Sequence, residues 1–221
     1  MNELLIYDII GYGDSSAESV RRTLQKADKS QPLTIRINSD GGSAFEGFAI
    51  FNALKEWKQP VNVFVDGLAA SAASVIMLAG TTVTMGPMSF VMIHEAWGGA
   101  IGNKGSIRHY ADLLENIDTV ATQQYAQRME KSVEEVAALL AAETWFNADD
   151  AVAAKLADKV SQKQQSMAFV EADPSNKSGN KWGYKNVPKS LLVDPAIAMQ
   201  NRQRPIRKPY REEEVKQLKG V

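Results

Sequence analysis

The chain of 221 residues contains 25 basic and 26 acidic residues, two histidines and no cysteine, and 44% of its residues are hydrophobic. A chain of this length buries a substantial core, and the absence of cysteine excludes disulfides, cysteine zinc sites and thiol nucleophiles. No apolar run reaches the roughly 18 residues of a membrane span, and no basic signal-peptide region precedes the first apolar residues. We therefore expect a soluble, cytoplasmic protein whose chemistry depends on oxygen and imidazole groups.

The formal charge of −1 combines two segments of opposite charge. Residues 1–160 hold 13 basic and 20 acidic residues, giving −7, whereas residues 161–221 hold 12 and 6, giving +6. The second segment is rich in turn-forming residues and proline and lacks sustained periodicity. We expect a folded domain over 1–165 and a basic, proline-containing C-terminal extension over 166–221 that is partly disordered or docks on an acidic partner. Nucleic acid is not expected, because few aromatic residues interleave the charges.

Strand-like and helix-like segments alternate along the first half of the chain, which favours an α/β fold. Serine followed three residues later by glutamate predicts a capping box at Ser15 with Glu18 and another at Ser43 with Glu46. The expected strands cover residues 4–10, 33–38, 61–65, 82–85 and 90–93, and the expected helices cover 15–24, 43–54 and 69–79.

Three further helices are expected in the second half of the folded domain. Residues 103–129 keep apolar positions at helical spacing through a largely polar segment. A helix of that length is more than a small core needs, so it either reaches a neighbouring subunit or lies as an ordinary surface helix. A second helix begins at Ser132, which forms a capping box with Glu135, and a third covers 147–157.

Only two histidines are available for catalysis. His109 lies within the long polar helix and is expected to be solvated. His94 ends the apolar strand 90–93 and precedes a glycine-containing segment, so its side chain can emerge at a sheet edge. A histidine at this position is either a structural residue or part of a functional site.

Ser71 is the candidate nucleophile. It follows the strand that Asp66 and Gly67 are expected to close, and it is expected in the first turn of the next helix. Free N–H groups and the helix dipole favour a developing oxyanion there. Ser74 is the rival hydroxyl one turn further on, and the surrounding alanines also fit simple close packing. Gly41 and Gly42 follow another strand. Either a backbone N–H group there acts as an oxyanion donor, or the two glycines simply form an ordinary turn.

Four motifs in this order, at 37–43, 67–73, 92–99 and 143–152, resemble those of a known family. They are similar to the Clp protease proteolytic subunits, the ClpP-like serine peptidases, and most similar to the phage or prophage branch, the head maturation proteases. The resemblance covers about residues 4–160. It implies a ClpP/crotonase-like fold, a repeated β-β-α superhelix with a protruding handle helix at about 104–130.

The resemblance also assigns roles to individual residues. It implies that Ser71 is the nucleophile and His94 the general base, and that the N–H groups of Gly42 and Ala72 form the oxyanion hole. The acid falls on Glu143, where the family more often has aspartate, with Asp149 or Asp150 as alternatives.

Substrate and assembly follow from the same resemblance. Trp97, Gly98 and Gly99, continued by residues 100–101, are expected to form an edge strand that pairs with an extended peptide. The handle helix is expected to pack subunits into stacked rings around a chamber. No cofactor or metal is implied. Because the printed chain begins almost at its first strand, without the pore-lining segment of housekeeping members, an ATPase unfoldase partner is not expected.

The predicted function is a serine endopeptidase that processes phage capsid or scaffold proteins, in the cytoplasm of a bacterial host if phage-encoded. One alternative is a crotonase-like acyl-CoA hydratase or isomerase, which shares the fold and the paired N–H groups but needs acid/base carboxylates instead of the Ser71 and His94 pair. The other is an inactive ring-forming scaffold protein. Retention of Ser71, His94 and an acidic residue favours the peptidase.

Overall fold

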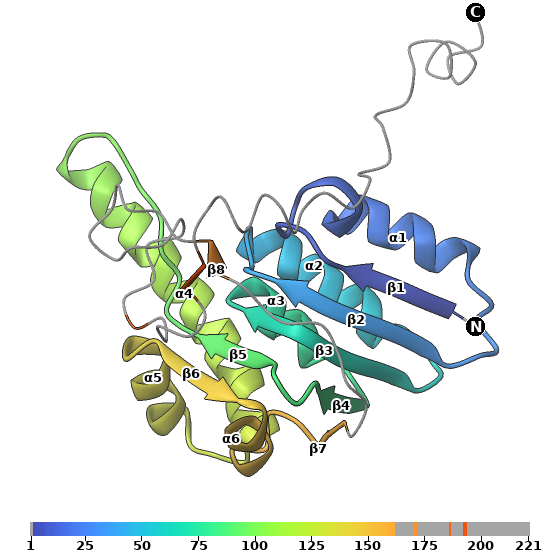
Figure 1. Ribbon diagram of the computed structural model, residues 1–221. Coiled ribbons are helices and arrows are strands. Elements are labelled where there is room, and N and C mark those ends of the chain that lie inside the picture. Colours follow the sequence, from blue (N-terminus) through green and yellow to red (C-terminus); the bar gives the residue numbers. More distant parts are fainter. Residues whose placement is uncertain (1, 162–169, 172–185, 187–191, 194–221) are drawn as a thin grey trace, which may run out of the picture.

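The computed structural model describes residues 2–161, 170–171, 186 and 192–193. The predicted boundary at 165 and most of the predicted extension lie outside these residues. Within the extension, β8 (Val170–Glu171) pairs in parallel with β9 (Leu192–Val193). The folded part is an α/β unit in which helices pack against a single larger sheet, as the alternating pattern predicts (Figure 1).

Within the described residues, the larger sheet has seven strands. Its backbone order is β1, β2, β3, β4 and β7, all parallel, while β5 branches from β3 and carries the antiparallel strand β6. The strands are β1 (Asn2–Ile6), β2 (Leu33–Ser39), β3 (Val61–Ala70), β4 (Thr82–Met85), β5 (Phe90–Ile93), β6 (Thr144–Asn147) and β7 (Lys159–Val160).

The branch arises because β3 changes partner along its length. Its first half pairs with β4 and its second half pairs with β5. On its other side, Ile37 faces Val65 but Ser39 faces Ala69, so β3 carries extra residues at this point. The side chain of Asn38 accepts the N–H of Leu68 at 3.2 Å and so satisfies a donor that the irregular ladder leaves over.

The helices cover one face of the sheet and one end of it. Figure 1 shows α1, α2 and α3 behind β1–β3, while α4 passes behind β5 and projects beyond the sheet. None of the described helices is both long and apolar enough to cross a membrane. The helices are α1 (Ala17–Lys26), α2 (Ala44–Lys55), α3 (Ala72–Met77), α4 (Lys104–Met129), α5 (Val133–Ala141) and α6 (Ala148–Ala153), with a 3₁₀ turn, η1, at Gly13–Ser15.

The core lies between the sheet and these helices. On β2, Leu33, Ile35 and Ile37 are buried and alternate with partly exposed residues, as expected for a strand with one covered face. In α1, only Val20 and Leu24 are buried, four residues apart on one side of the helix. Burying each such side chain contributes about 1.5–3 kcal/mol, which fixes the strands relative to the helices.

Two predictions near the N-terminus are wrong in detail. The first strand ends at Ile6 rather than residue 10. Its pairing with β2 stops at Ile6, and Ile10 forms an isolated bridge with Gly42 instead. The predicted box of Ser15 with Glu18 does not form: Ser15 is buried in the 3₁₀ turn, and the cap of α1 is Ser16.

The cap of α2 is only half of the expected box. Ser43 accepts the N–H of Glu46 as predicted. The Glu46 carboxylate, however, accepts the N–H of Ala17 at 2.7 Å, at the start of α1. The Glu46 carboxylate, which the sequence predicts to bond within α2, therefore links α2 to α1.

The third strand is longer than predicted. It continues through Asp66 and Gly67 to Ala70, and α3 begins at Ala72 rather than 69. The reason is Arg36 on the neighbouring strand, which holds the Asp66 carboxylate through its Nε at 2.8 Å and through a second nitrogen. An Asp-Gly pair that resembles a turn is thereby kept in the sheet.

The later elements agree better with the sequence. Helix α4 confirms the predicted long helix, and the capping box of Ser132 with Glu135 is present at α5. The last helix, α6, ends at Ala153 rather than 157. The short strands β6 and β7 were not predicted, because each is paired by a segment distant in the sequence.

Candidate active site

The candidate residues meet at one edge of the sheet. Parallel strands end at the same edge, so the segments that follow β2, β3 and β5 lie side by side there. Strand β6 is antiparallel to β5 and begins opposite its end, with Thr144 facing Ile93. Figure 1 shows the ends of β2, β3 and β5 on the same side, with the start of β6 beside them.

Ser71 occupies the junction between β3 and α3. Its backbone angles are φ 54° and ψ −126°, a region that residues with a side chain rarely adopt. The N–H of Ser71 donates to the carbonyl of Met92 at 2.9 Å, so the junction is tied to β5. The prediction that Ser71 lies inside the first helical turn is wrong by one residue, because Ser71 precedes the helix and turns the chain sharply.

The glycine loop after β2 lies directly against this turn. A Cβ atom added at Gly41 would lie 2.7 Å from the carbonyl oxygen of Ala70 and 2.7 Å from the Cβ of Ser71. Only glycine allows so close an approach, and its φ of 97° also requires glycine. Gly41 therefore brings the loop into contact with Ser71.

His94 lies within hydrogen-bond distance of Ser71. The two atoms, Nε2 of His94 and Oγ of Ser71, are 2.7 Å apart. Burial lowers the pKa of His94 from its ordinary value of 6.5, and the nearby charge of Glu143 partly opposes this shift. A neutral imidazole beside a hydroxyl can accept the hydroxyl proton, so this pair has the arrangement of a general base and a nucleophile.

Glu143 lies close enough to His94 for its charge to affect the imidazole. Because Thr144 faces Ile93 in the antiparallel pair, the residues next to them, Glu143 and His94, end up at the same edge. Glu143 is 8% exposed and has a φ of 50°. Its Oε1 accepts the indole N–H of Trp145 at 3.2 Å and the backbone N–H of Asn186 at 2.7 Å. Two N–H donors on one oxygen restrict the orientation of the carboxylate.

Of the two predicted oxyanion donors, Ala72 directly follows Ser71 in the chain and Gly42 directly follows Gly41, which approaches Ser71. Ala72 is the first residue of α3, and N–H groups of a first turn have no carbonyl partner within their own helix. Gly42 has a φ of 150°, and a Cβ there would lie 2.4 Å from the carbonyl oxygen of Ile10. The loop is fixed by the N–H of Ile10 donating to Gly41 and that of Ser43 donating to Ile10, at 2.8 and 3.0 Å.

A second serine supports the turn at Ser71. Oγ of Ser74 donates to the carbonyl oxygen of Ser71 at 2.6 Å and lies 2.6 Å from the hydroxyl of Tyr125 on α4. A serine hydroxyl has one proton, so Tyr125 is the donor of the second bond. Ser74, the rival nucleophile of the sequence analysis, is fully buried and contributes to the position of Ser71.

The segment after His94 is exposed. Trp97 is 65% exposed, and no strand occurs among residues 94–103. The expected edge strand over 97–101 depends on pairing with an extended peptide, so it stays a prediction. Its beginning is held by the N–H of Ala96, which donates to Asp118 of α4 at 2.6 Å. A Cβ at Gly98 would collide with the hydroxyl of Tyr110.

Several residues considered in the sequence do not reach the site. Asp149 and Asp150 lie exposed in the first turn of α6, next to Asn147, which faces Phe90 at the opposite end of β5 from His94. Both aspartates therefore lie at the end of β5 that is distant from His94. His109 is exposed on α4, as predicted. In the part of the chain that the structure describes, no group of three metal-ligating side chains occurs.

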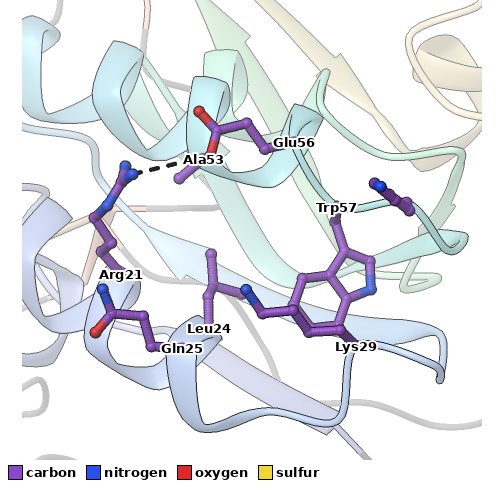
Figure 2. A pocket seen from close by; sticks show the side chains of 8 residues that line it. Arg21, Leu24, Gln25, Lys29, Ala53, Glu56 and Trp57 are labelled. Atoms are coloured by element: carbon purple, nitrogen blue, oxygen red, sulfur yellow. Dashed lines mark ion pairs between the residues drawn. The ribbon is translucent and has the colours of Figure 1, made fainter.

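The surface also has a pocket of about 510 Å³ at the C-terminal ends of α1 and α2 (Figure 2). Trp57 forms one wall, and Arg21 and Glu56 face each other across the opening as a 4.0 Å ion pair. None of the residues that line it is a candidate of the sequence analysis. Ser71 lies near the opposite end of α2, where Gly47 packs against Ala72.

Comparison with known proteins identifies the family. The sequence profile of the family described as Clp protease matches residues 7–164. This chain belongs to the Clp protease family. These are serine-type peptidases, and the described site geometry fits that class. The match spans β2, β3, β5 and β6 and the segments that join them.

Individual members of the Clp protease family agree with this assignment. The chain is 30% identical to an ATP-dependent Clp protease proteolytic subunit of Pleurastrum terricola over 71% of its length and 84% of the relative's. It is 31% identical to an ATP-dependent Clp protease proteolytic subunit 2 of Treponema denticola, over 68% and 77%. A ClpP1 mutant from Listeria monocytogenes shows the same fold, with a TM-score of 0.66 and 25% identity over 73% of this chain and 92% of that one. The predicted ClpP/crotonase-like fold is confirmed.

The structure adds three residues that the sequence analysis did not single out. Trp145 and Asn186 both donate to Glu143, and Tyr125 supports Ser71 through Ser74. Trp145 lies within the fourth motif, two residues after Glu143, and its indole N–H was an available signal. Asn186 is 43 positions from Glu143 and has no local pattern that marks it.

Proposed function

We propose that the protein is a serine endopeptidase in which Ser71 is the nucleophile, His94 the general base and Glu143 the acid. The observation that carries this proposal is the 2.7 Å approach of His94 Nε2 to Ser71 Oγ, with the buried Glu143 close enough to His94 for its charge to act on the imidazole. The Clp protease family membership supports the same reaction class.

The reaction follows from these positions. Ser71 Oγ attacks the carbonyl carbon of the scissile peptide bond while His94 Nε2 takes the hydroxyl proton. The N–H groups of Gly42 and Ala72 stabilise the oxyanion of the tetrahedral intermediate. The C–N bond then breaks, and His94 delivers the proton to the leaving amine. Water activated by His94 hydrolyses the acyl-enzyme and restores Ser71. Glu143 orients the imidazole and stabilises its protonated form.

Substrate binding is assigned to the exposed segment of Trp97, Gly98 and Gly99. We propose that an extended peptide pairs with this segment, main chain to main chain, and converts it into the edge strand that the single chain lacks. Glycine at 98 leaves room for Tyr110 behind the segment, so the backbone is supported by α4. Pairing of this kind gives weak sequence preference.

The assembly proposed for this chain is a homo-oligomeric ring built on α4. Its C-terminal half carries the buried residues Tyr125, Ala126 and Met129, whereas Ile107 and Leu113 in its N-terminal half are exposed apolar side chains. Apolar residues on a projecting helix favour packing against another subunit. We propose that peptide cleavage needs no ATP, and that a proteolytic domain over 1–165 carries a basic extension over 166–221.

The biological substrate we propose is a capsid or scaffold protein in phage head maturation, in the cytoplasm of a bacterial host. The support is the similarity of the four motifs to the phage branch of the family. Co-expression with the capsid and scaffold proteins of the same genome tests this, since mass spectrometry should show a processed product with the native chain and none with Ser71→Ala. Unprocessed capsid and scaffold with an active native chain would exclude this substrate.

Turnover of fluorogenic peptides without ATP tests the enzymatic proposal. Ser71→Ala and His94→Ala should abolish hydrolysis, and Glu143→Gln should lower kcat about 10⁴-fold if it acts like the acid of other triads. Asp150→Asn is a matched control, because this carboxylate lies outside the site. Hydrolysis that survives Ser71→Ala would remove the serine mechanism, and near-normal rates in Glu143→Gln would remove Glu143 from it.

A further inference from the structure

A residue far along the C-terminal extension contacts the proposed catalytic acid. The backbone N–H of Asn186 donates to Oε1 of Glu143 at 2.7 Å, and the side-chain amide of Asn186 donates to the carbonyl oxygen of Ala142 at 2.8 Å. One residue of the extension therefore donates hydrogen bonds to two adjacent residues of the folded domain. The family match ends at residue 164, so Asn186 lies outside the part of the chain that the family profile describes.

The contact acts on a side chain that needs to be held in place. Glu143 is 8% exposed and follows α5 with a φ of 50°. A glutamate has one more rotatable bond than an aspartate, so more conformational freedom must be lost to orient its carboxylate toward His94. Asn186 and Trp145 both donate to Oε1, which fixes this oxygen from two directions. Hydrogen bonds to a charged acceptor are stronger than neutral ones.

We propose that Asn186 is a positioning residue: its backbone N–H holds the Glu143 carboxylate in the orientation that supports His94. The inference rests on the proposed function, because it assigns Glu143 to the triad. The extension then has a role in catalysis within its own chain, in addition to any contact with a partner. In this assignment the effect of Asn186 on catalysis passes entirely through Glu143.

Two substitutions in the full-length chain separate the two contacts. Asn186→Pro removes the N–H that binds Glu143, since proline has no backbone donor. Asn186→Ala keeps this N–H and removes only the amide that binds Ala142. Asn176→Pro, the same change ten residues earlier in the extension, is the control. Kinetic constants for a fluorogenic peptide are measured for each variant, and light scattering checks that the oligomeric mass is unchanged.

The expected result is a selective effect on kcat. Asn186→Pro should lower kcat about tenfold, the size expected for one hydrogen bond to a charged group, with KM changed less than about twofold. Asn186→Ala should lower kcat less than about threefold, and Asn176→Pro should have no effect. In a Glu143→Gln background, Asn186→Pro should change kcat less than about twofold, because the carboxylate it positions is already gone.

Other outcomes overturn the inference, and they can be told apart from failure of the proposed function. A normal kcat in Asn186→Pro, or the same loss in the presence and absence of the Glu143 carboxylate, would show that Asn186 does not act through Glu143. If Asn186→Pro alters the oligomeric mass, Asn186→Ala is the variant that decides. A loss of kcat in Asn186→Ala as large as that in Glu143→Gln would then contradict the inference, because this variant keeps the N–H that binds Glu143. Full activity of Glu143→Gln would remove the triad assignment and this inference together, whereas dependence on Glu143 alone would remove only the inference.

Discussion

The hydroxyl pair of Ser74 and Tyr125 leads to an unequal effect of two similar substitutions. Tyr125→Phe removes one neutral hydrogen bond and leaves the Ser74 hydroxyl bonded to the Ser71 carbonyl, which should cost about 1 kcal/mol of unfolding free energy. Ser74→Ala removes both bonds and leaves the Tyr125 hydroxyl, which is 2% exposed, without that acceptor. The unsatisfied donor adds about 1–3 kcal/mol, so the expected total is about 3 kcal/mol.

The double variant is the decisive comparison. With both hydroxyls absent, no buried donor is left unpaired, so its loss should be smaller than the sum of the single losses by about 1 kcal/mol or more. Burial raises the pKa of Tyr125 well above its ordinary value, so the hydroxyl keeps its proton across the working pH range. Urea unfolding at one fixed protein concentration measures all three variants, because oligomer stability depends on concentration. Equal losses in the two single variants, or strictly additive losses, would refute the assigned donor direction.

Three further predictions concern the site and its support. Because burial lowers the pKa of His94 and the neutral imidazole is the base, kcat/KM should rise with pH through a midpoint below the ordinary value of 6.5. A pH profile with its midpoint above 6.5 would contradict this. Gly42→Ala should lower both stability and activity, since its Cβ would lie 2.4 Å from the Ile10 carbonyl oxygen; unchanged unfolding and turnover would show that the loop yields without cost. Asp66→Asn should lower the free energy of unfolding by about 3 kcal/mol, because Asp66 is 1% exposed and Arg36 would lose its charged partner. A decrease of less than about 1 kcal/mol in urea unfolding would show that the ion pair stabilises the fold little.

The sequence predicts those parts of the fold that depend on local pattern. The strands 82–85 and 90–93, the long helix and the box of Ser132 with Glu135 agree with the structure. The meeting of Ser71 and His94 follows from local pattern, because each residue comes after an apolar strand and parallel strands end at a common edge. The register of β5 and β6 then places Glu143 beside His94, which the resemblance had indicated without a structural reason.

The errors arise where a distant residue decides the local structure. Arg36 keeps Asp66 within β3, although the sequence around Asp66 favours a turn. Glu46 caps α1 instead of completing its own box, because Ala17 offers an N–H at 2.7 Å. Asn186 reaches Glu143 across 43 positions. Each of these contacts is a tertiary interaction that no periodicity or motif in the sequence predicts.

The peptidase proposal depends most directly on the reactivity of Ser71. The full-length protein is treated with a fluorophosphonate, and the adduct is located by mass spectrometry of its peptides. A single adduct on Ser71 that is lost in His94→Ala is the predicted result, because the imidazole 2.7 Å away must take the hydroxyl proton for attack to occur. An unlabelled Ser71 in the native protein, or labelling that is undiminished in His94→Ala, would contradict the account.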